Sequence, residues 1–112
     1  MTIFEKIITR EIPATIVYED DDVIAFRDID PKAPTHILVT TKRMIPTLND
    51  LQEDDAELVG KMILAAKEIA ASENIAASGY RLVFNCNSDG GQSVDHIHCH
   101  ILGGRKMTWP PG

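Results

Sequence analysis

The chain has 112 residues, of which 44% are hydrophobic and 25% are charged, a composition typical of one globular domain (residues 1–112) with a single hydrophobic core. Its formal net charge of −6 argues against long nucleic acid as the main partner, because such binders rely on lysine and arginine side chains that neutralise phosphates. The sequence has no apolar run of about 20 residues and no secretion signal, which predicts a cytoplasmic protein with no membrane partner. It has only two cysteines, and both are expected to be reduced.

A short helix is predicted near the N-terminus, over residues 2–8. Thr2 is a candidate N-cap, and Glu5 three residues later completes a capping box. Apolar side chains recur on one face of this segment, and they belong to Ile3, Phe4, Ile7 and Ile8.

Three strands and an acidic turn are predicted next. Residues 15–18 and 23–27 are rich in β-branched and aromatic side chains, so we expect them to pair as a hairpin. The acidic run 19–22 between them is interpreted as a solvated turn. Two prolines make residues 28–34 a loop, and a third strand is expected over 36–40.

The second half of the chain is predicted to hold one long helix and two further strands. Apolar residues recur at helical spacing over 54–73, with charged residues on the other faces. Strands are expected over residues 80–85 and 94–102, separated by a polar, glycine-rich loop over 87–92. This order of elements predicts an α+β domain with a largely antiparallel five-stranded sheet.

Three of the four histidines alternate in the stretch His96-Ile97-His98-Cys99-His100. Alternate side chains of a strand point to the same face, so the three imidazoles are expected to share one side of the sheet. Imidazoles crowded on one face disfavour each other's protonation and pack poorly, which indicates a functional use. Two uses compete at this point: three neutral imidazoles can hold a zinc ion, or one can attack an electrophile while its neighbours handle protons.

A glycine-rich loop directly precedes these histidines and favours the second use. Gly90 and Gly91 allow the backbone to approach a ligand closely and to aim N–H groups at it, which suits phosphate oxygens. Gln92 and Ser93 add hydrogen-bond donors beside the histidines. The loop therefore favours nucleophilic chemistry at phosphorus, although Asp95 is also placed to support a metal-bound imidazole.

From Ser88 to Arg105 the sequence resembles the signature of the histidine triad (HIT) superfamily, and in particular its Hint branch of nucleotide-binding proteins. The similarity extends over nearly the whole chain and includes the terminal Trp109-Pro110-Pro111-Gly112, which is characteristic of that branch. The resemblance implies a HIT-like fold, a homodimer and the activity of a purine nucleoside phosphoramidase. Such enzymes hydrolyse the P–N bond of adenosine or guanosine 5′-phosphoramidates, including aminoacyl-adenylate-like substrates, without a metal or other cofactor.

The resemblance also implies roles for individual residues. His98 is expected to be the nucleophile that forms a nucleotidyl-histidine, with its attacking tautomer fixed by a carbonyl group on the other ring nitrogen. His100 is expected to contact phosphate oxygens, while His96 and His36 support the proton network. Ser93 is expected to contact the phosphate or the leaving-group nitrogen.

A nucleotide pocket is implied in the same way. Asp28 matches the position whose carboxylate accepts hydrogen bonds from the ribose hydroxyls, and Trp109 matches a tryptophan that recognises the leaving group at the partner subunit's site. The other expected contacts are an apolar clamp for the purine, formed by Ile3, Phe4, Ile7, Phe26 and Ile29, and a polar wall formed by Asn85 and Gln92. Gly91 and Val94 are expected to bind the nucleotide as well.

Two acidic residues depart from the family pattern. Asp30 stands where relatives have a small polar residue, and Asp95 replaces an aromatic residue just before the triad; both bear on selectivity. Three alternatives remain open on the sequence: cleavage of dinucleoside polyphosphates or nucleotidyl transfer, metal-dependent hydrolysis on the three histidines, and a nucleotide-responsive interaction module.

Overall fold

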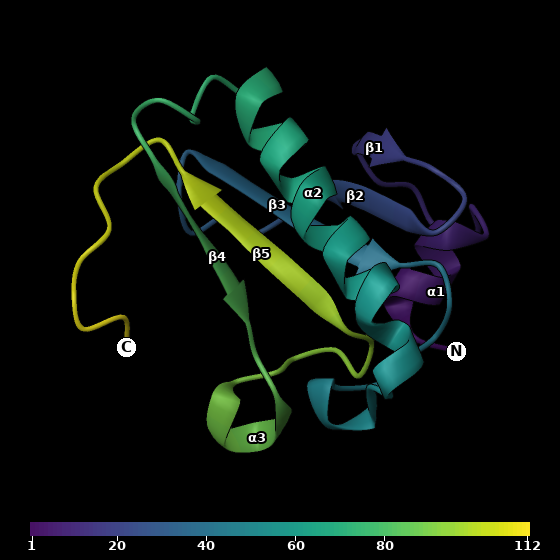
Figure 1. Cartoon of the computed structure of the whole chain (residues 1–112). Helices are drawn as coiled ribbons and strands as arrows, with labels where there is room; N and C mark the ends of the chain where they lie inside the picture. Colours follow the sequence, from purple (N-terminus) through teal and green to yellow (C-terminus); the bar gives the residue numbers. More distant parts are fainter.

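A five-stranded antiparallel sheet organises the fold, with strand order β1-β2-β3-β5-β4. The computed structural model describes residues 1–112. Figure 1 shows the long helix α2 crossing one face of the sheet, while the short helix α1 lies behind the sheet. The elements are α1 (Ile3–Ile8), β1 (Ile16–Glu19), β2 (Val23–Arg27), β3 (Thr35–Thr41), α2 (Ala56–Ser72), β4 (Tyr80–Phe84), α3 (Asn87–Gly90) and β5 (His98–Gly103). The predicted α+β architecture is confirmed.

Helix α1 begins at the predicted capping box. The Glu5 amide donates to the Thr2 hydroxyl oxygen at 3.2 Å, and the Thr2 amide donates to the Glu5 carboxylate at 2.9 Å. These two bonds satisfy N–H groups that have no partner within the helix. The helix buries Phe4 and Ile7 against the sheet.

The alternation of side chains along β3 and β5 separates two cores. Ile37 and Val39 of β3, with Cys99 and Ile101 of β5, pack on the α2 face in the larger core. Leu38 faces the other side and packs with Phe4, Ile7 and Phe26. His98 and His100 share this second face, because His100 lies opposite Leu38 and His98 lies opposite Thr40 in the register of the two strands.

Helix α2 closes the larger core. It begins at Ala56, two residues later than predicted, because residues Glu53–Asp55 form a tighter 3-10 turn. Its buried residues recur at helical spacing and are Met62, Ala65, Ala66, Ile69 and Ala70. None of the helices combines the length and the apolar character needed to cross a membrane.

Two local predictions are wrong. The last strand begins at His98 rather than at residue 94, since residues 94–96 form a bend. The segment expected to be a loop over 87–92 contains the four-residue helix α3, and Gly91, with φ 78°, caps its C-terminal end. Glycine suits this left-handed position because a Cβ atom there is strained.

Candidate active site

A cavity of about 300 Å³ opens between α1 and the face of the sheet that carries His98 and His100. The predicted apolar clamp lines it, together with Asp28, Ser93 and Val94. Phe4 and Phe26 are buried, whereas Ile3 is half-exposed and Ile29 is 96% exposed, so these two isoleucines form an open rim. The cavity is thus apolar toward α1 and polar toward β5, the composition typical of a small-molecule site.

His98 presents a free ring nitrogen to this cavity. Its Nδ1–H donates to the carbonyl oxygen of His96 at 2.7 Å, so in the neutral ring the lone pair is on Nε2. The Phe4 ring packs edge-on against the imidazole with centroids 4.9 Å apart, which restricts its rotation. This arrangement provides a neutral, oriented nucleophile.

His100 is held by a chain of hydrogen bonds that passes through His36. The Lys32 amide donates to Nδ1 of His36 at 3.0 Å, so the single proton of a neutral His36 ring is on Nε2. That N–H donates to Nδ1 of His100 at 2.9 Å, which places the proton of a neutral His100 ring on its own Nε2. His100, 5.0 Å from His98 between ring centroids, therefore has one N–H left for a ligand.

His96 does not line the cavity, although its ring packs against Phe4 of α1, with centroids 5.8 Å apart. The residue lies in the bend before β5 and is fully buried. Its Nε2–H donates to the carbonyl oxygen of Thr41 at 2.7 Å, and Nδ1 lies 3.5 Å from the Thr2 hydroxyl. The side chain thus fixes the backbone whose carbonyl orients His98. The Thr40 hydroxyl, which donates to the Ile97 carbonyl at 2.7 Å, holds the same segment.

The environment keeps the imidazoles neutral. Burial lowers the pKa of His36, His96 and His98 below the ordinary histidine value. Burial, together with the neighbouring His98 and His36, lowers the pKa of His100 to about 4. At neutral pH each ring therefore has one donor and one acceptor nitrogen, which the hydrogen-bond assignments above require.

The amides expected to face a phosphate are not those of the glycine pair. The Gly91 amide donates to Ser88 and the Gln92 amide donates to Asn87, so both are used within the α3 turn. The amides of Ser93 and Val94 have no hydrogen-bond partner in the chain, and both residues line the cavity. The glycines therefore shape the turn, and the two amides that follow it are free for an anion.

The two residues of the predicted polar wall brace this loop and do not line the cavity. The Gln92 side chain donates to the carbonyl groups of Pro46 and Val94 and accepts from the Asn87 amide. The Asn85 amide group donates to the Gly90 carbonyl at 2.7 Å. These bonds hold the segment that carries Ser93 in place.

Trp109 lies outside the cavity as well. It is 81% exposed on the C-terminal tail, which runs beside the edge strand β4 in Figure 1. Arg81 of β4 anchors the tail: its guanidinium donates to the Thr108 carbonyl at 2.8 Å and lies 5.9 Å from the centroid of the Trp109 ring.

The zinc site considered from the sequence is not formed by His96, His98 and His100, because His96 points to Thr41. The donor atoms that do lie within 4.8 Å of one another belong to Asp28, His36 and His100. In this group Nε2 of His36 carries the proton shared with His100, and its Nδ1 accepts from Lys32. His36 therefore has no free lone pair for a cation, and the donor set does not fit a metal.

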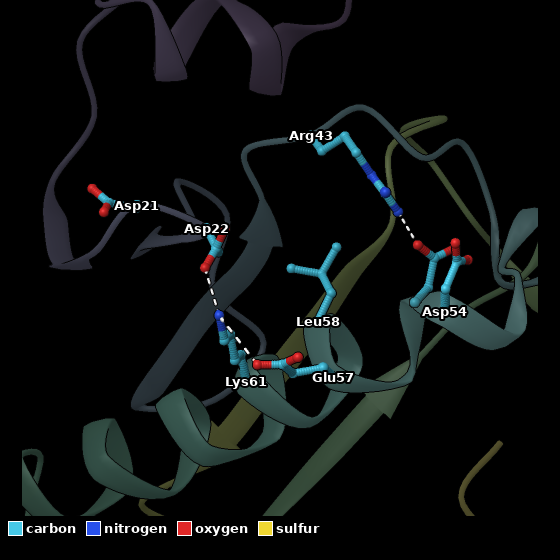
Figure 2. A pocket seen from close by; sticks show the side chains of 8 residues that line it. Asp21, Asp22, Arg43, Asp54, Glu57, Leu58 and Lys61 are labelled. Carbon is cyan, nitrogen blue, oxygen red and sulfur yellow. Dashed lines mark hydrogen bonds and ion pairs between the residues drawn. The ribbon is translucent and has the colours of Figure 1, made fainter.

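A second hollow, of about 310 Å³, lies on the α2 side of the molecule (Figure 2). Lys61 sits between Asp22 and Glu57, at 2.7 and 3.9 Å, and Arg43 pairs with Asp55. This hollow contains no histidine, cysteine or serine. The exposed ion pairs of Lys61 add little stability. Residues 20–22 form the predicted solvated turn, whereas Glu19 of the acidic run is the last residue of β1.

Sequence reasoning missed several walls of the cavity. Leu38 lines its floor from β3, and Ile12, Pro13 and Ala14 line one side. The alternation of β3 contained the signal for Leu38, since this residue shares the face of His36. The segment 12–14 has no regular structure, and no periodicity marked it.

Known proteins match the chain over most of its length. A family model described as HIT domain matches residues 9–107. The purine nucleoside phosphoramidase of Escherichia coli is 57% identical over 106 residues, which cover 95% of this chain and 89% of that protein. An uncharacterized HIT-like protein of Synechocystis is 51% identical and covers 99% of this chain and 96% of its own length. The crystal structure of a HIT family hydrolase from Legionella pneumophila is 55% identical, with a TM-score of 0.98 over 100% of both chains.

Proposed function

The chain belongs to the HIT domain family, and we propose that it is a purine nucleoside phosphoramidase, a hydrolase that cleaves the P–N bond of adenosine or guanosine 5′-phosphoramidates. One observation carries the proposal: His98 faces an apolar cavity with a free Nε2 while its Nδ1–H is bound to the His96 carbonyl. The identity of 57% to the Escherichia coli phosphoramidase supports the same activity.

In the first step, the Nε2 lone pair of His98 attacks phosphorus. A bond forms between Nε2 and phosphorus, the P–N bond to the leaving group breaks, and its electron pair stays on the leaving nitrogen. Solvent supplies a proton to that nitrogen through the exposed Ser93 hydroxyl, and an amine leaves. The imidazole becomes cationic, and its Nδ1–H keeps the bond to the His96 carbonyl.

In the second step, water attacks phosphorus and the bond to Nε2 breaks. The electron pair returns to His98, the water proton passes to solvent, and a nucleoside monophosphate is released. Oxygens on phosphorus gain negative charge in both steps. The N–H of His100 and the amides of Ser93 and Val94 are the donors proposed to stabilise that charge.

The rest of the cavity is suited to a nucleoside. Phe4, Ile7 and Phe26 offer apolar surface to a purine, and the exposed Ile3 and Ile29 can close over it. Asp28 lies between this apolar part and the imidazoles, where a carboxylate can accept the ribose hydroxyls.

The test compares wild type with His98→Asn on adenosine 5′-phosphoramidate, with product followed by chromatography and binding of AMP followed by calorimetry. We expect the variant to lose turnover while AMP affinity stays within about threefold, since Asn cannot act as the nucleophile. Turnover that persists in His98→Asn contradicts the assignment. A wild-type preference for diadenosine polyphosphates, or a loss of activity in chelator that zinc restores, contradicts the proposed reaction.

We also propose that the protein is a cytoplasmic homodimer. Strand β4 is an edge of the sheet, and the outer backbone groups of an edge strand are available to pair with a second copy. The tail anchored on β4 by Arg81 holds Trp109 away from its own cavity, which suits a contact with a partner subunit. Both cysteines are free. Light scattering that gives the mass of a single chain contradicts the dimer.

A further inference from the structure

Asp28 is the one carboxylate among the residues that line the cavity. It follows the end of β2, and 20% of its side chain is exposed. Its Oδ1 accepts the Asp30 amide at 2.8 Å, which fixes the rotation of the carboxylate. The other oxygen, Oδ2, lies 3.5 Å from Nε2 of His36 and so faces the imidazoles.

Asp28 and its charged neighbours Asp30 and Lys32 affect the imidazoles of the cavity differently. Asp30, two residues away, is 84% exposed and pairs with Lys32 at 2.5 Å, so its charge is directed to solvent. Burial lowers the pKa of His36, His98 and His100, and for each of them the Asp28 carboxylate acts in the opposite direction. The charges of Lys32 and Asp30 have opposite effects on the pKa of His36: Lys32 lowers it and Asp30 raises it. Burial lowers the pKa of His96, which does not line the cavity, and the charged group that opposes this effect is Glu5.

The attack of His98 on phosphorus creates a positive charge that a nearby negative charge can stabilise. A neutral His98 that bonds to phosphorus becomes a cation, and burial disfavours that cation. We propose that the Asp28 carboxylate is the counter-charge for the cationic nucleotidyl-His98, in addition to binding the ribose. This inference rests on the proposed phosphoramidase function. An anion fixed beside the imidazoles before the reaction stabilises the positive charge without rearrangement.

A substrate without ribose hydroxyls separates the two roles of Asp28. We suggest measuring kcat and KM for adenosine 5′-phosphoramidate and for its 2′,3′-dideoxy analogue with wild type, Asp28→Asn and Asp30→Asn. Asparagine at position 28 keeps an oxygen that can accept the Asp30 amide, so the turn is preserved. On the dideoxy substrate we expect Asp28→Asn to lower kcat at least about tenfold, whereas Asp30→Asn, which removes an exposed charge, changes it by less than about twofold.

A second measurement needs no substrate. The four histidine ring signals are titrated by NMR in wild type and in Asp28→Asn. We expect the pKa values of His36, His98 and His100 to fall in the variant, while that of His96 stays constant and serves as an internal control.

An unchanged kcat on the dideoxy substrate, or unchanged titration of these three histidines, overturns the proposal and leaves Asp28 as a ribose ligand only. A wild type that hydrolyses neither substrate contradicts the proposed function instead. In that case the titration alone decides whether Asp28 acts on the imidazoles, and a null result there still overturns the inference.

Discussion

His36 can act either by orienting His100 or as a general acid or base, and the loss of kcat on its replacement distinguishes these two roles. Its Nδ1 is occupied by the Lys32 amide and its Nε2–H is directed at His100, so the ring orients His100 and has no free site to take up a proton. Replacing it by leucine removes one hydrogen bond to His100, a net loss of about 0.5–1.5 kcal/mol, or about two- to tenfold in kcat. A general acid or base contributes about 100-fold or more.

The matched variant is His36→Gln, whose side-chain N–H₂ reaches the position of Nε2 but cannot exchange protons at neutral pH. We expect His36→Leu to lower kcat about tenfold and His36→Gln to recover most of that loss. The assay is steady-state hydrolysis of adenosine 5′-phosphoramidate, with thermal unfolding as a check that both variants are folded. A loss of more than about 100-fold in both folded variants refutes the orienting role.

Three further outcomes are expected. Burial lowers the pKa of His98, and protonation removes its attacking lone pair. The value of kcat/KM should therefore stay level from about pH 8 to about pH 6.5 and fall only at lower pH. A fall that begins above about pH 6.5 contradicts a lowered pKa. Gly91 has φ 78°, so Gly91→Ala should lower the free energy of unfolding, measured in urea, by about 1 kcal/mol. Gly90→Ala is the control and should leave this free energy nearly unchanged, because its added Cβ meets no atom closer than 3.7 Å. Arg81→Gln should lower the fluorescence anisotropy of Trp109, the single tryptophan, and an unchanged value argues against the anchor.

Local sequence signals were sufficient for most of the fold. The Thr2–Glu5 pair predicts the first residue of α1 because its two bonds close within three residues. The helical spacing of Met62, Ala66 and Ile69 predicts the buried face of α2. In both cases the information is carried by neighbours in the chain, so no knowledge of the tertiary structure is needed.

Distant contacts explain the errors around the triad. The Ile97 amide donates to the Ile45 carbonyl at 2.7 Å, and the Gln92 side chain donates to the carbonyl groups of Pro46 and Val94. The bonds to Ile45 and Pro46 connect parts of the chain that are more than 40 residues apart, and they hold residues 94–96 in the bend before β5. An alternating pattern cannot reveal that a strand starts two residues after its first histidine.

The pairing of His36 with His100 also depends on strand register. His36 lies opposite Leu102 and His100 lies opposite Leu38, so the two histidines are diagonal neighbours on one face of β3 and β5. A register shifted by one residue moves His36 to the α2 face, where Ile37 now packs. The family resemblance identified His36 as part of the site, but its partner follows only from the register.

Backbone groups, rather than pairs of side chains, distinguish the histidines from one another. His36 accepts from the Lys32 amide, His96 donates to the Thr41 carbonyl, and His98 donates to the carbonyl of His96. In each ring the nitrogen that meets the backbone determines what the other nitrogen can do. Only His98 is left with a lone pair that faces the cavity, while His100, reached through His36, is left with an N–H. Chemically identical side chains therefore become a nucleophile, a donor and a structural support, and the carbonyl and amide positions that make this assignment are set by the sheet and the bend before β5.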